Sequence, residues 1–172
     1  MKDIIVCYVT PVVAVLGFLF SLYQYYINAH RGQKESTLIA YRKLQDITVP
    51  TVRELRGKIP RIVSKITECK KTKDCRKCGE CERCEEYKDW NKLTTSLADL
   101  ENFCVGINLK IYDINVLNRL GGGHFIQLFS SLEPIITEKR KDKSSKHYDE
   151  FEMTVNELKR RRKKLDKNVI QG

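Results

Sequence analysis

The chain has 172 residues, 41% of them hydrophobic, and a formal net charge of +10. This length supports one domain of ordinary size once the hydrophobic N-terminal segment is set apart. Only nine Gly and four Pro occur, and Leu, Ile, Lys and Glu dominate the body. This composition argues against a turn-rich β fold and favours an all-α protein.

The first element is an apolar segment near the N-terminus. Residues 4–29 contain no charged side chain and are bounded by Lys2-Asp3 and His30-Arg31. At about 1.5 Å per residue, such a helix spans roughly 39 Å, which is enough to cross a hydrocarbon core of roughly 30 Å with some tilt. Tyrosines gather at its ends, as is typical of residues at headgroup depth. We therefore predict a transmembrane anchor over residues 1–30.

The alternative for this segment is a cleaved secretory signal, which has a positive N-terminal region and an apolar core of about 7–15 residues. Lys2 is offset by Asp3, the apolar run is longer, and Asn28-Ala29-His30 is a poor cleavage site, so we favour an anchor. Lys and Arg gather on its C-terminal side. This asymmetry predicts a single-pass protein of the plasma (inner) membrane, with its N-terminus outside and its body in the cytoplasm.

Apolar residues at helical spacing predict a small cytoplasmic helical bundle over residues 31–158. Its first helix is expected to run directly out of the anchor and to end at Pro50. Thr51 and Glu54 then have the spacing of a capping box, in which Thr51 caps a free amide of the next helix and Glu54 reaches back. Pro60 is expected to kink or restart that next helix.

The strongest helical periodicity lies in the second half of the chain. It predicts a central helix between Tyr87 and Ile111, a short helix capped by Asp113 and a break at the glycines 121–123. A further helix is expected to kink at Pro134. The apolar positions of the last two helices are Phe125, Leu128, Phe129, Leu132, Ile135 and Ile136, then Tyr148, Phe151, Val155, Leu158 and Leu165.

Several helix-packing patterns stand out in this half: residues 97–103, Gly106-Ile107, Tyr112-Asp113, Pro134-Ile135-Ile136 with Arg140, and residues 148–152. Together with the anchor, they resemble an uncharacterised prokaryotic family of short helical proteins with an N-terminal membrane anchor. The resemblance covers the anchor and residues 93–158. It implies a helical fold but no reaction and no catalytic residues.

A cysteine-rich insertion departs from that family pattern over residues 68–86. Its cysteines are Cys69, Cys75, Cys78, Cys81 and Cys84, of which the last four follow each other as C-x-x-C-x-x-C-x-x-C. Clustered thiols in a reducing cytosol are more often metal ligands or redox groups than disulfides. Zinc takes four such ligands in a tetrahedron, so we predict these five cysteines as candidate zinc ligands.

The spacing of the cysteines leaves other possibilities open. On a regular helix each third residue steps back by about 60°, so four cysteines converge on one ion only if the segment loops, as Gly79 allows. The first three also match the C-x-x-C-x-x-C of bacterial ferredoxins, although the run then continues differently. Redox-switchable thiols and a loop without bound metal are the remaining alternatives.

Other residues with chemical potential have simpler explanations. Cys104 and Cys7 lie on apolar segments, as small core residues do. His124 follows three glycines, but no P-loop lysine accompanies it, so a hinge is favoured over an anion-binding turn. Carboxylates of the bundle are expected to pair with Arg119 and Arg140 and to fix helix register. These carboxylates are Asp99, Glu101, Asp113, Glu133 and Glu152.

The C-terminal tail is basic, with twelve Lys and Arg against six Asp and Glu from residue 139 onward. On a membrane-tethered body, the tail over residues 159–172 suggests contact with anionic lipid headgroups, with a solvated, frayed helix end as the alternative. Nucleic-acid binding through residues 160–164 is less favoured.

No nucleophile and base stand in a recognisable context, so we predict that the chain is not an enzyme. The favoured function is a membrane-anchored interaction or sensing module with a metal-binding or redox-responsive cysteine loop. Its expected partners are membrane lipid and a protein, either another chain or a second copy. The alternative is an oligomerising membrane effector or signalling protein, for example in a defence system.

Overall fold

The computed structural model describes residues 2–72, 85–142 and 146–170, and the side chains within 12–70, 85–141 and 146–164. The elements are α1 (Lys2–Leu55), the 3₁₀ helix η1 (Arg56–Lys58), α2 (Ile59–Thr72), α4 (Glu85–Asn108), α5 (Ile114–Asp142) and α6 (Asp149–Ile170). Throughout this part of the chain the regular structure is helical, which confirms the predicted all-α class.

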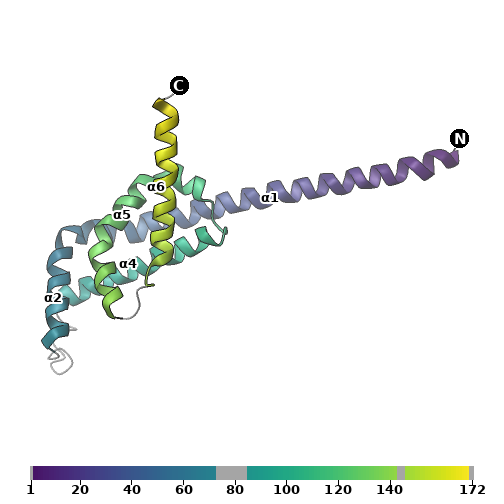
Figure 1. Ribbon diagram of the computed structural model, residues 1–172. Coiled ribbons are helices and arrows are strands. Elements are labelled where there is room, and N and C mark those ends of the chain that lie inside the picture. The colour runs from purple at the N-terminus through teal and green to yellow at the C-terminus, as the bar shows by residue number, and fades with distance from the viewer. Residues whose placement is uncertain (1, 73–84, 143–145, 171–172) are drawn as a thin grey trace.

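Helix α1 is one continuous helix of 54 residues, and only its C-terminal part joins the bundle (Figure 1). Every side chain from residue 12 to residue 26 is exposed, whereas one face is buried from Thr37 onward. The predicted passage of one helix from the apolar segment into the body is therefore confirmed.

The prediction that Pro50 ends this helix is wrong, because α1 continues through Pro50 to Leu55. A proline removes one backbone hydrogen bond, here the bond to the carbonyl of residue 46, and both residues lie on the exposed face where water can replace it. Val49, Val52 and Leu55 are buried against the bundle, and their burial offsets the cost of the proline.

The predicted capping box is also wrong. Thr51 lies inside α1, where its hydroxyl donates to the carbonyl of Ile47 at 3.0 Å instead of capping a new helix. The chain turns only at η1, and α2 then restarts with Pro60 in its first turn. A proline costs little there because the first amides of a helix have no partner within it. The predicted restart at Pro60 is confirmed.

Helix α4 is the predicted central helix, and α4 and α5 each pack against α1, α2 and α6. The core has these members: Leu44, Val49, Val52, Leu55, Ile59, Ile62, Ile66, Trp90, Leu93, Leu97, Leu100, Phe103, Cys104, Ile107, Leu117, Phe125, Leu128, Leu132, Ile135, Ile136, Phe151, Val155 and Leu158. The apolar pattern overshoots at Ile111, which lies beyond the end of α4 and is exposed.

The end of α4 is shaped by Gly106 and Lys110. A Cβ atom on Gly106 would lie 2.4 Å from the ring of Tyr112, so only glycine lets that ring fold back onto the helix. Lys110 adopts the left-handed backbone conformation with a φ of 59°, and the chain then reverses. Asp113 follows and caps α5, its carboxylate accepting from the amide of Asn115 at 2.7 Å as predicted.

Helix α5 contains the predicted glycine break as a kink within one helix. Gly121 has non-helical backbone angles, and a Cβ atom there would lie 1.9 Å from the hydroxyl of Tyr41 on α1. The kink therefore lets α5 approach α1 closely. Beyond it, the helix continues through Pro134 to Asp142.

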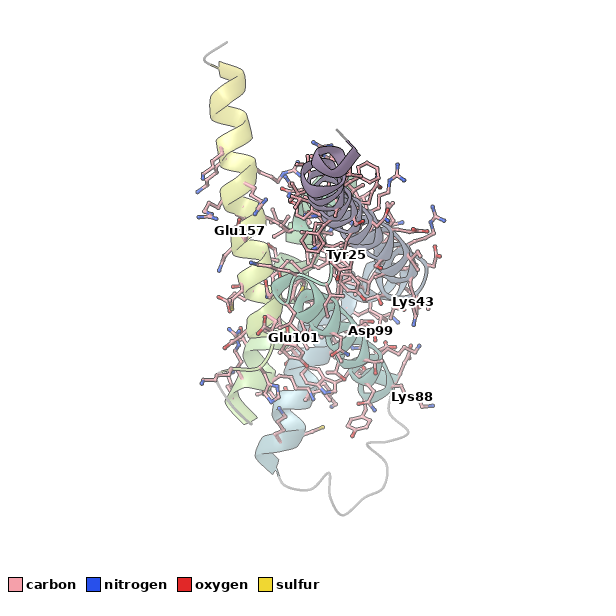
Figure 2. The ribbon with its side chains drawn as sticks, turned by 90° about the vertical axis from the view of Figure 1, so that its right-hand side faces the viewer. Tyr25, Lys43, Lys88, Asp99, Glu101 and Glu157 are labelled. Atoms are coloured by element: carbon pink, nitrogen blue, oxygen red, sulfur yellow. The ribbon has the colours of Figure 1, made fainter. Side chains whose placement is uncertain are left out.

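Helix α6 runs steeply across α1 in Figure 1, and Figure 2, viewed along α1, keeps α6 upright beside it. Aromatic rings link it to the bundle: Phe151 packs edge-to-face on Phe125 at 5.2 Å and on Phe129 at 5.1 Å between ring centroids. The part that carries the basic tail projects beyond the bundle (Figure 1).

Candidate functional site

Residues 12–26 of α1 form an apolar surface that the bundle leaves uncovered. From Val12 onward, α1 contains an 18-residue apolar stretch, and none of that stretch is buried. Phe18, for example, is 64% exposed. Within the described residues, α1 is the one helix that is long and apolar enough to cross a membrane. The criterion is length and composition, and a signal sequence also satisfies it.

The bundle is fastened to α1 directly beyond this apolar surface. The side-chain amide of Gln33 donates to the carbonyl of Lys110 at 2.7 Å. Thr37 is fully buried, and its hydroxyl donates to the carbonyl of Gln33 and accepts from the amide of Asp113, both at 2.7 Å. The turn between α4 and α5 is thereby held on α1. No local pattern indicated these contacts, because polar residues on one helix face do not reveal which distant backbone they will meet.

A shallow groove of about 270 Å³ separates α1 from α4 further along. Lys43 and Asp99, both labelled in Figure 2, belong to its lining, together with Thr48, Asn102 and Phe103. Thr48 donates to the carboxylate of Asp99 at 3.4 Å. These groups can contact a polar peptide or a small polar ligand.

Glu101 of α4 caps α6 from the neighbouring helix. Its carboxylate accepts from the amides of Glu150 at 3.2 Å and Phe151 at 2.8 Å. Burial raises the pKa of Glu101, while the two amide hydrogen bonds act in the opposite direction. Since the amides at a helix N-terminus have no partner within the helix, this contact ties the start of α6 to α4.

Arg140 of α5 makes the second polar tie to α6. Its guanidinium contacts Glu152 at 2.7 Å and Asp149 at 3.1 Å, and donates to the carbonyl of His147 at 2.8 Å. The predicted pairing of Arg140 with Glu152 is confirmed, and it sets the register of α6 on α5. Arg119 is exposed on α5.

In the tail, the first two arginines are engaged within the protein. Arg160 and Arg161 both contact the carboxylate of Glu157 at 2.7 Å. The hydrogen bond from Arg160, together with that from Arg161, lowers the pKa of Glu157 against a smaller opposing effect of burial. Arg162, whose guanidinium lies over Gly122 and Gly123, also contacts the bundle. Part of the basic tail thus has a structural role.

A polar cluster lies near the end of α2, close to where the cysteine-rich segment begins. The carboxylate of Glu138 is almost fully buried and accepts from Lys70 at 3.2 Å and from Lys141 at 3.0 Å. Burial alone would raise the pKa of Glu138, but hydrogen bonds from Lys141 and Lys70 and their positive charges lower it. The ammonium groups of Lys70 and Lys139 also lie 5.7 and 5.4 Å from the centre of the Trp90 ring. This cluster joins α2, α4 and α5.

The predicted zinc ligands fall mainly outside the described residues. Cys69 lies near the end of α2 and is partly exposed, whereas Cys75, Cys78, Cys81 and Cys84 belong to residues 73–84. Among the side chains that the structure does describe, no three His, Cys, Asp or Glu are grouped as a metal ion would require. The zinc site therefore stays a prediction.

Cys104 lies in the core and His124 lies beside the kink of α5, in agreement with the structural roles predicted for them. Cys104 is fully buried in α4, and burial strongly raises the pKa of its thiol, as befits an unreactive core residue. His124 is partly buried in α5 just after the kink at Gly121. The side chain of Cys7 lies outside the described part.

A protein-family model described as "Domain of unknown function (DUF4760)" matches residues 11–158. The match begins within the apolar segment and ends at Leu158, which is the last core residue of α6. It therefore covers the whole bundle and leaves out the basic tail. No curated protein and no solved structure matches the chain.

Proposed function

The chain belongs to the DUF4760 family of domains of unknown function, and we propose that it is a single-pass membrane protein whose helical bundle is an interaction module. In this proposal, α1 serves both as the anchor and as a core helix of the bundle. The observation that carries the proposal is the continuity of α1 from an apolar stretch, residues 12–26, in which every side chain is exposed, into a part with one buried face.

Physical chemistry supports a bilayer as the partner of the apolar half. Soluble monomers rarely expose continuous apolar surfaces of more than a few hundred Å². In a bilayer, each Leu, Ile, Phe or Val near the helix centre favours insertion by about 0.3–0.6 kcal/mol, and a helix satisfies its own backbone polar groups. The exposed large aliphatic and phenylalanine side chains of this stretch are Val12, Val13, Val15, Leu16, Phe18, Leu19, Phe20 and Leu22, and Tyr23, Tyr25 and Tyr26 follow them.

We further propose that the bundle is cytoplasmic at the plasma membrane and the N-terminus lies outside. The support is the distribution of charge: Arg31, Lys34, Arg42 and Lys43 follow the apolar half, whereas Lys2 alone precedes it. A protease added to sealed inverted vesicles should remove a C-terminal tag, and the same protease outside intact spheroplasts should not. The opposite pattern would reverse the orientation.

The anchor itself is tested by extraction of membranes that contain the full chain. The protein should stay in the pellet at alkaline carbonate and high salt and should enter solution only with detergent. Recovery of the intact chain in the carbonate supernatant would refute membrane insertion. Recovery of a shorter chain that begins near residue 30 would identify the apolar half as a cleaved signal.

A protein partner is proposed for the outer face of α1 in the bundle. Leu38, Ile39 and Ile47 are exposed there, and they alternate with the charged residues Arg42 and Asp46. The apolar side chains of this strip can form the core of a small interface and its charged residues the rim, with another protein or with a second copy of this chain. Cross-linking of the full chain in membranes distinguishes a different protein from a second copy as the partner. A cross-linked dimer or larger oligomer of this chain supports the alternative of an oligomerising membrane effector, and toxicity of the overexpressed chain supports that alternative further.

A second proposed function concerns zinc, and it is supported by the C-x-x-C-x-x-C-x-x-C spacing of residues 75–84. The segment joins α2 to α4, and an ion pair between Arg61 and Glu86 at 2.6 Å links these two helices. Lys58 of η1, just before α2, pairs with Glu85 of α4 at 3.4 Å. Binding or oxidation within the segment would therefore act on helices that belong to the bundle.

Metal analysis tests this second proposal. The full chain purified in detergent should carry about one zinc, which protects its thiols from alkylation, and the variant Cys75→Ser with Cys78→Ser should lose both properties. Cys104→Ser is the matched control, because that buried thiol lies in the core. Metal far below one equivalent together with fully reactive thiols would exclude a metal site.

A further inference from the structure

The turn between α4 and α5 presents two apolar side chains to its surroundings. Leu109 is 67% exposed and Ile111 is 55% exposed, on either side of the exposed Lys110. The backbone beneath them is well ordered by hydrogen bonds. The amide of Leu109 donates to the carbonyl of Val105 at 2.9 Å, and that of Ile111 donates to the carbonyl of Gly106 at 2.9 Å. The two side chains therefore stand on a rigid support.

The position of this turn along α1 is set by Gln33. The side chain of Gln33 donates to the carbonyl of Lys110 at 2.7 Å, so the turn lies at the level of Gln33 on the helix. Gln33 follows Ala29, the last residue of the uncharged segment, by four positions, which is about 6 Å of helix. Figure 1 shows the turn at the edge of the bundle from which the N-terminal half of α1 emerges.

This distance corresponds to the headgroup layer of a bilayer. The hydrocarbon core is about 30 Å thick and the whole bilayer about 40–45 Å, so each headgroup region is roughly 5–8 Å deep. The uncharged segment is longer than the core is thick, so in a tilted α1 its last residue, Ala29, lies at the edge of the core. The turn then reaches the interfacial layer, where apolar side chains can insert and Lys and Arg extend their charged ends toward the headgroups.

The charges around the turn fit the same surroundings. Arg31 and Lys34 are exposed on α1 next to Gln33, and Lys110 is exposed at the tip of the turn. Three acidic residues lie nearby: Asp113 caps α5, Glu150 accepts from the side chain of Asn108 at 2.6 Å, and Glu35 is exposed. Two of these carboxylates are held by hydrogen bonds to the protein, whereas the long side chains of the three exposed cations can reach anionic phosphate headgroups.

We propose that the turn between α4 and α5 is a second membrane contact, in which Leu109 and Ile111 insert into the interfacial layer of an anionic bilayer beside the anchor. Lys110, Arg31 and Lys34 then lie among the phosphate groups. This inference rests on the proposed anchoring by α1. Its consequence is that the bundle touches the membrane at two points, so it cannot rotate freely about the axis of α1.

The test places a fluorescent indole at the turn of the full chain. Leu109→Trp and, as a matched control, Ile47→Trp are reconstituted into vesicles of phosphatidylcholine and phosphatidylglycerol, with and without lipids brominated near the headgroup end of the acyl chains. Ile47 is 57% exposed but lies 14 positions beyond Gln33, about 21 Å further along α1. The native Trp90 is buried and contributes the same background to both variants.

The indole at position 109 should emit at shorter wavelength in the vesicles and be quenched severalfold more strongly by the brominated lipids than the indole at position 47. Adding Lys110→Glu should weaken this quenching in anionic vesicles and leave it nearly unchanged in neutral ones. Equal quenching at both positions, in a chain that still floats with the vesicles, would overturn the second contact and leave the anchor intact. A blue shift without lipid quenching would mean that protein covers the turn, which also overturns it. A chain that fails to float would refute the anchor as well.

Discussion

The two halves of α1 share one backbone but meet different surroundings. Between residues 12 and 26 side chains are exposed around the whole circumference and are mostly apolar. From Thr37 to Leu55, one face is buried, with Leu44, Thr48, Val52 and Leu55 at steps of four, four and three, and charged residues occupy the opposite face. A helix that is apolar on all sides needs an apolar solvent, whereas an amphipathic one needs a core on one side and water on the other. If α1 is the proposed anchor, the change between them marks where the membrane ends and the bundle begins.

The largest expected effect comes from charging the first half. Leu16→Arg with Leu19→Arg should release the chain from membranes, because each Arg near the centre of a transmembrane helix costs about 2.5–3.5 kcal/mol of insertion free energy. Carbonate extraction measures the shift from pellet to supernatant. Ile39→Arg, on an exposed position of the second half, should leave the chain in the pellet. If both variants stay in the pellet, the first half is not the anchor.

The second prediction compares the stability effects of two phenylalanines, one in the bundle and one in the apolar stretch of α1. Phe151→Ala should lower the free energy of unfolding of the bundle by about 3–5 kcal/mol, because that ring is fully buried between Phe125 and Phe129. Phe18→Ala removes an exposed ring and should leave bundle stability unchanged. Urea unfolding in detergent, followed by circular dichroism, measures both. Equal losses would contradict the division of α1 into two regions.

A pair of glycines sharpens the same division. Gly121→Ala should destabilise the bundle by about 1–3 kcal/mol, because the new methyl group would lie 1.9 Å from the hydroxyl of Tyr41 and force it to move. That hydroxyl also accepts from Gln45 at 2.7 Å, and the move would break this bond. Gly17→Ala has no atom within 4 Å and should cost nothing. The unfolding midpoint measures this loss. Adding Tyr41→Phe to the Gly121→Ala variant removes the hydroxyl that the new methyl group meets, so part of the lost midpoint should return. If the midpoint does not rise, the destabilisation has another cause.

The cap on α6 is expected to contribute less. Glu101→Ala should cost about 0.5–2 kcal/mol of bundle stability, the usual range for a lost helix cap. Glu133 is exposed on α5, and Glu133→Ala should change stability by no more than about 0.5 kcal/mol. Thermal unfolding of the three proteins in the same detergent gives the comparison. If Glu101→Ala is as stable as the parent, the hydrogen bonds from Glu101 to the start of α6 do not contribute to bundle stability.

The smallest effects are two pH dependences of opposite sign. The pKa of Glu138 is lowered from 4.5, so the stability it contributes is complete above that value and is lost as pH falls through its folded pKa. The pKa of Glu101 is raised from 4.5. The stability that Glu101 contributes through this shift is therefore complete below 4.5 and is lost as pH rises through its folded pKa. Stability measured against pH in Glu138→Gln and Glu101→Gln should therefore differ from the parent in opposite directions, and parallel changes would contradict this assignment.

Local patterns predicted most of the helices. The spacing of Leu93, Leu97 and Leu100 predicted the buried face of α4, and all three are fully buried. Asp113 was expected to cap α5 and does so. These features depend on residues within one or two helical turns of each other, so a single sequence contains enough information to identify them.

The same rules failed where distant residues outweigh local preference. Pro50 and Thr51 carry strong signals for a helix end and a helix start, yet both lie inside α1 because burial of their neighbours against α4 and α5 stabilises a continuous helix. Ile111 continues the apolar pattern of α4 but lies past its end, where Lys110 reverses the chain. Each error reflects tertiary packing that overrides propensity.

The apolar segment, the helical class and the kink at Gly121 follow from the order of residues alone, because each arises from interactions that act over a few positions. The attachment of the turn at Lys110 to Gln33 and the cap of α6 by Glu101 required the folded chain. Their partners stand 77 and about 50 positions apart, and a helix face offers many polar groups that could serve equally well. Packing of the core chooses among them, since the arrangement that buries the apolar faces of α4, α5 and α6 also decides which polar groups meet.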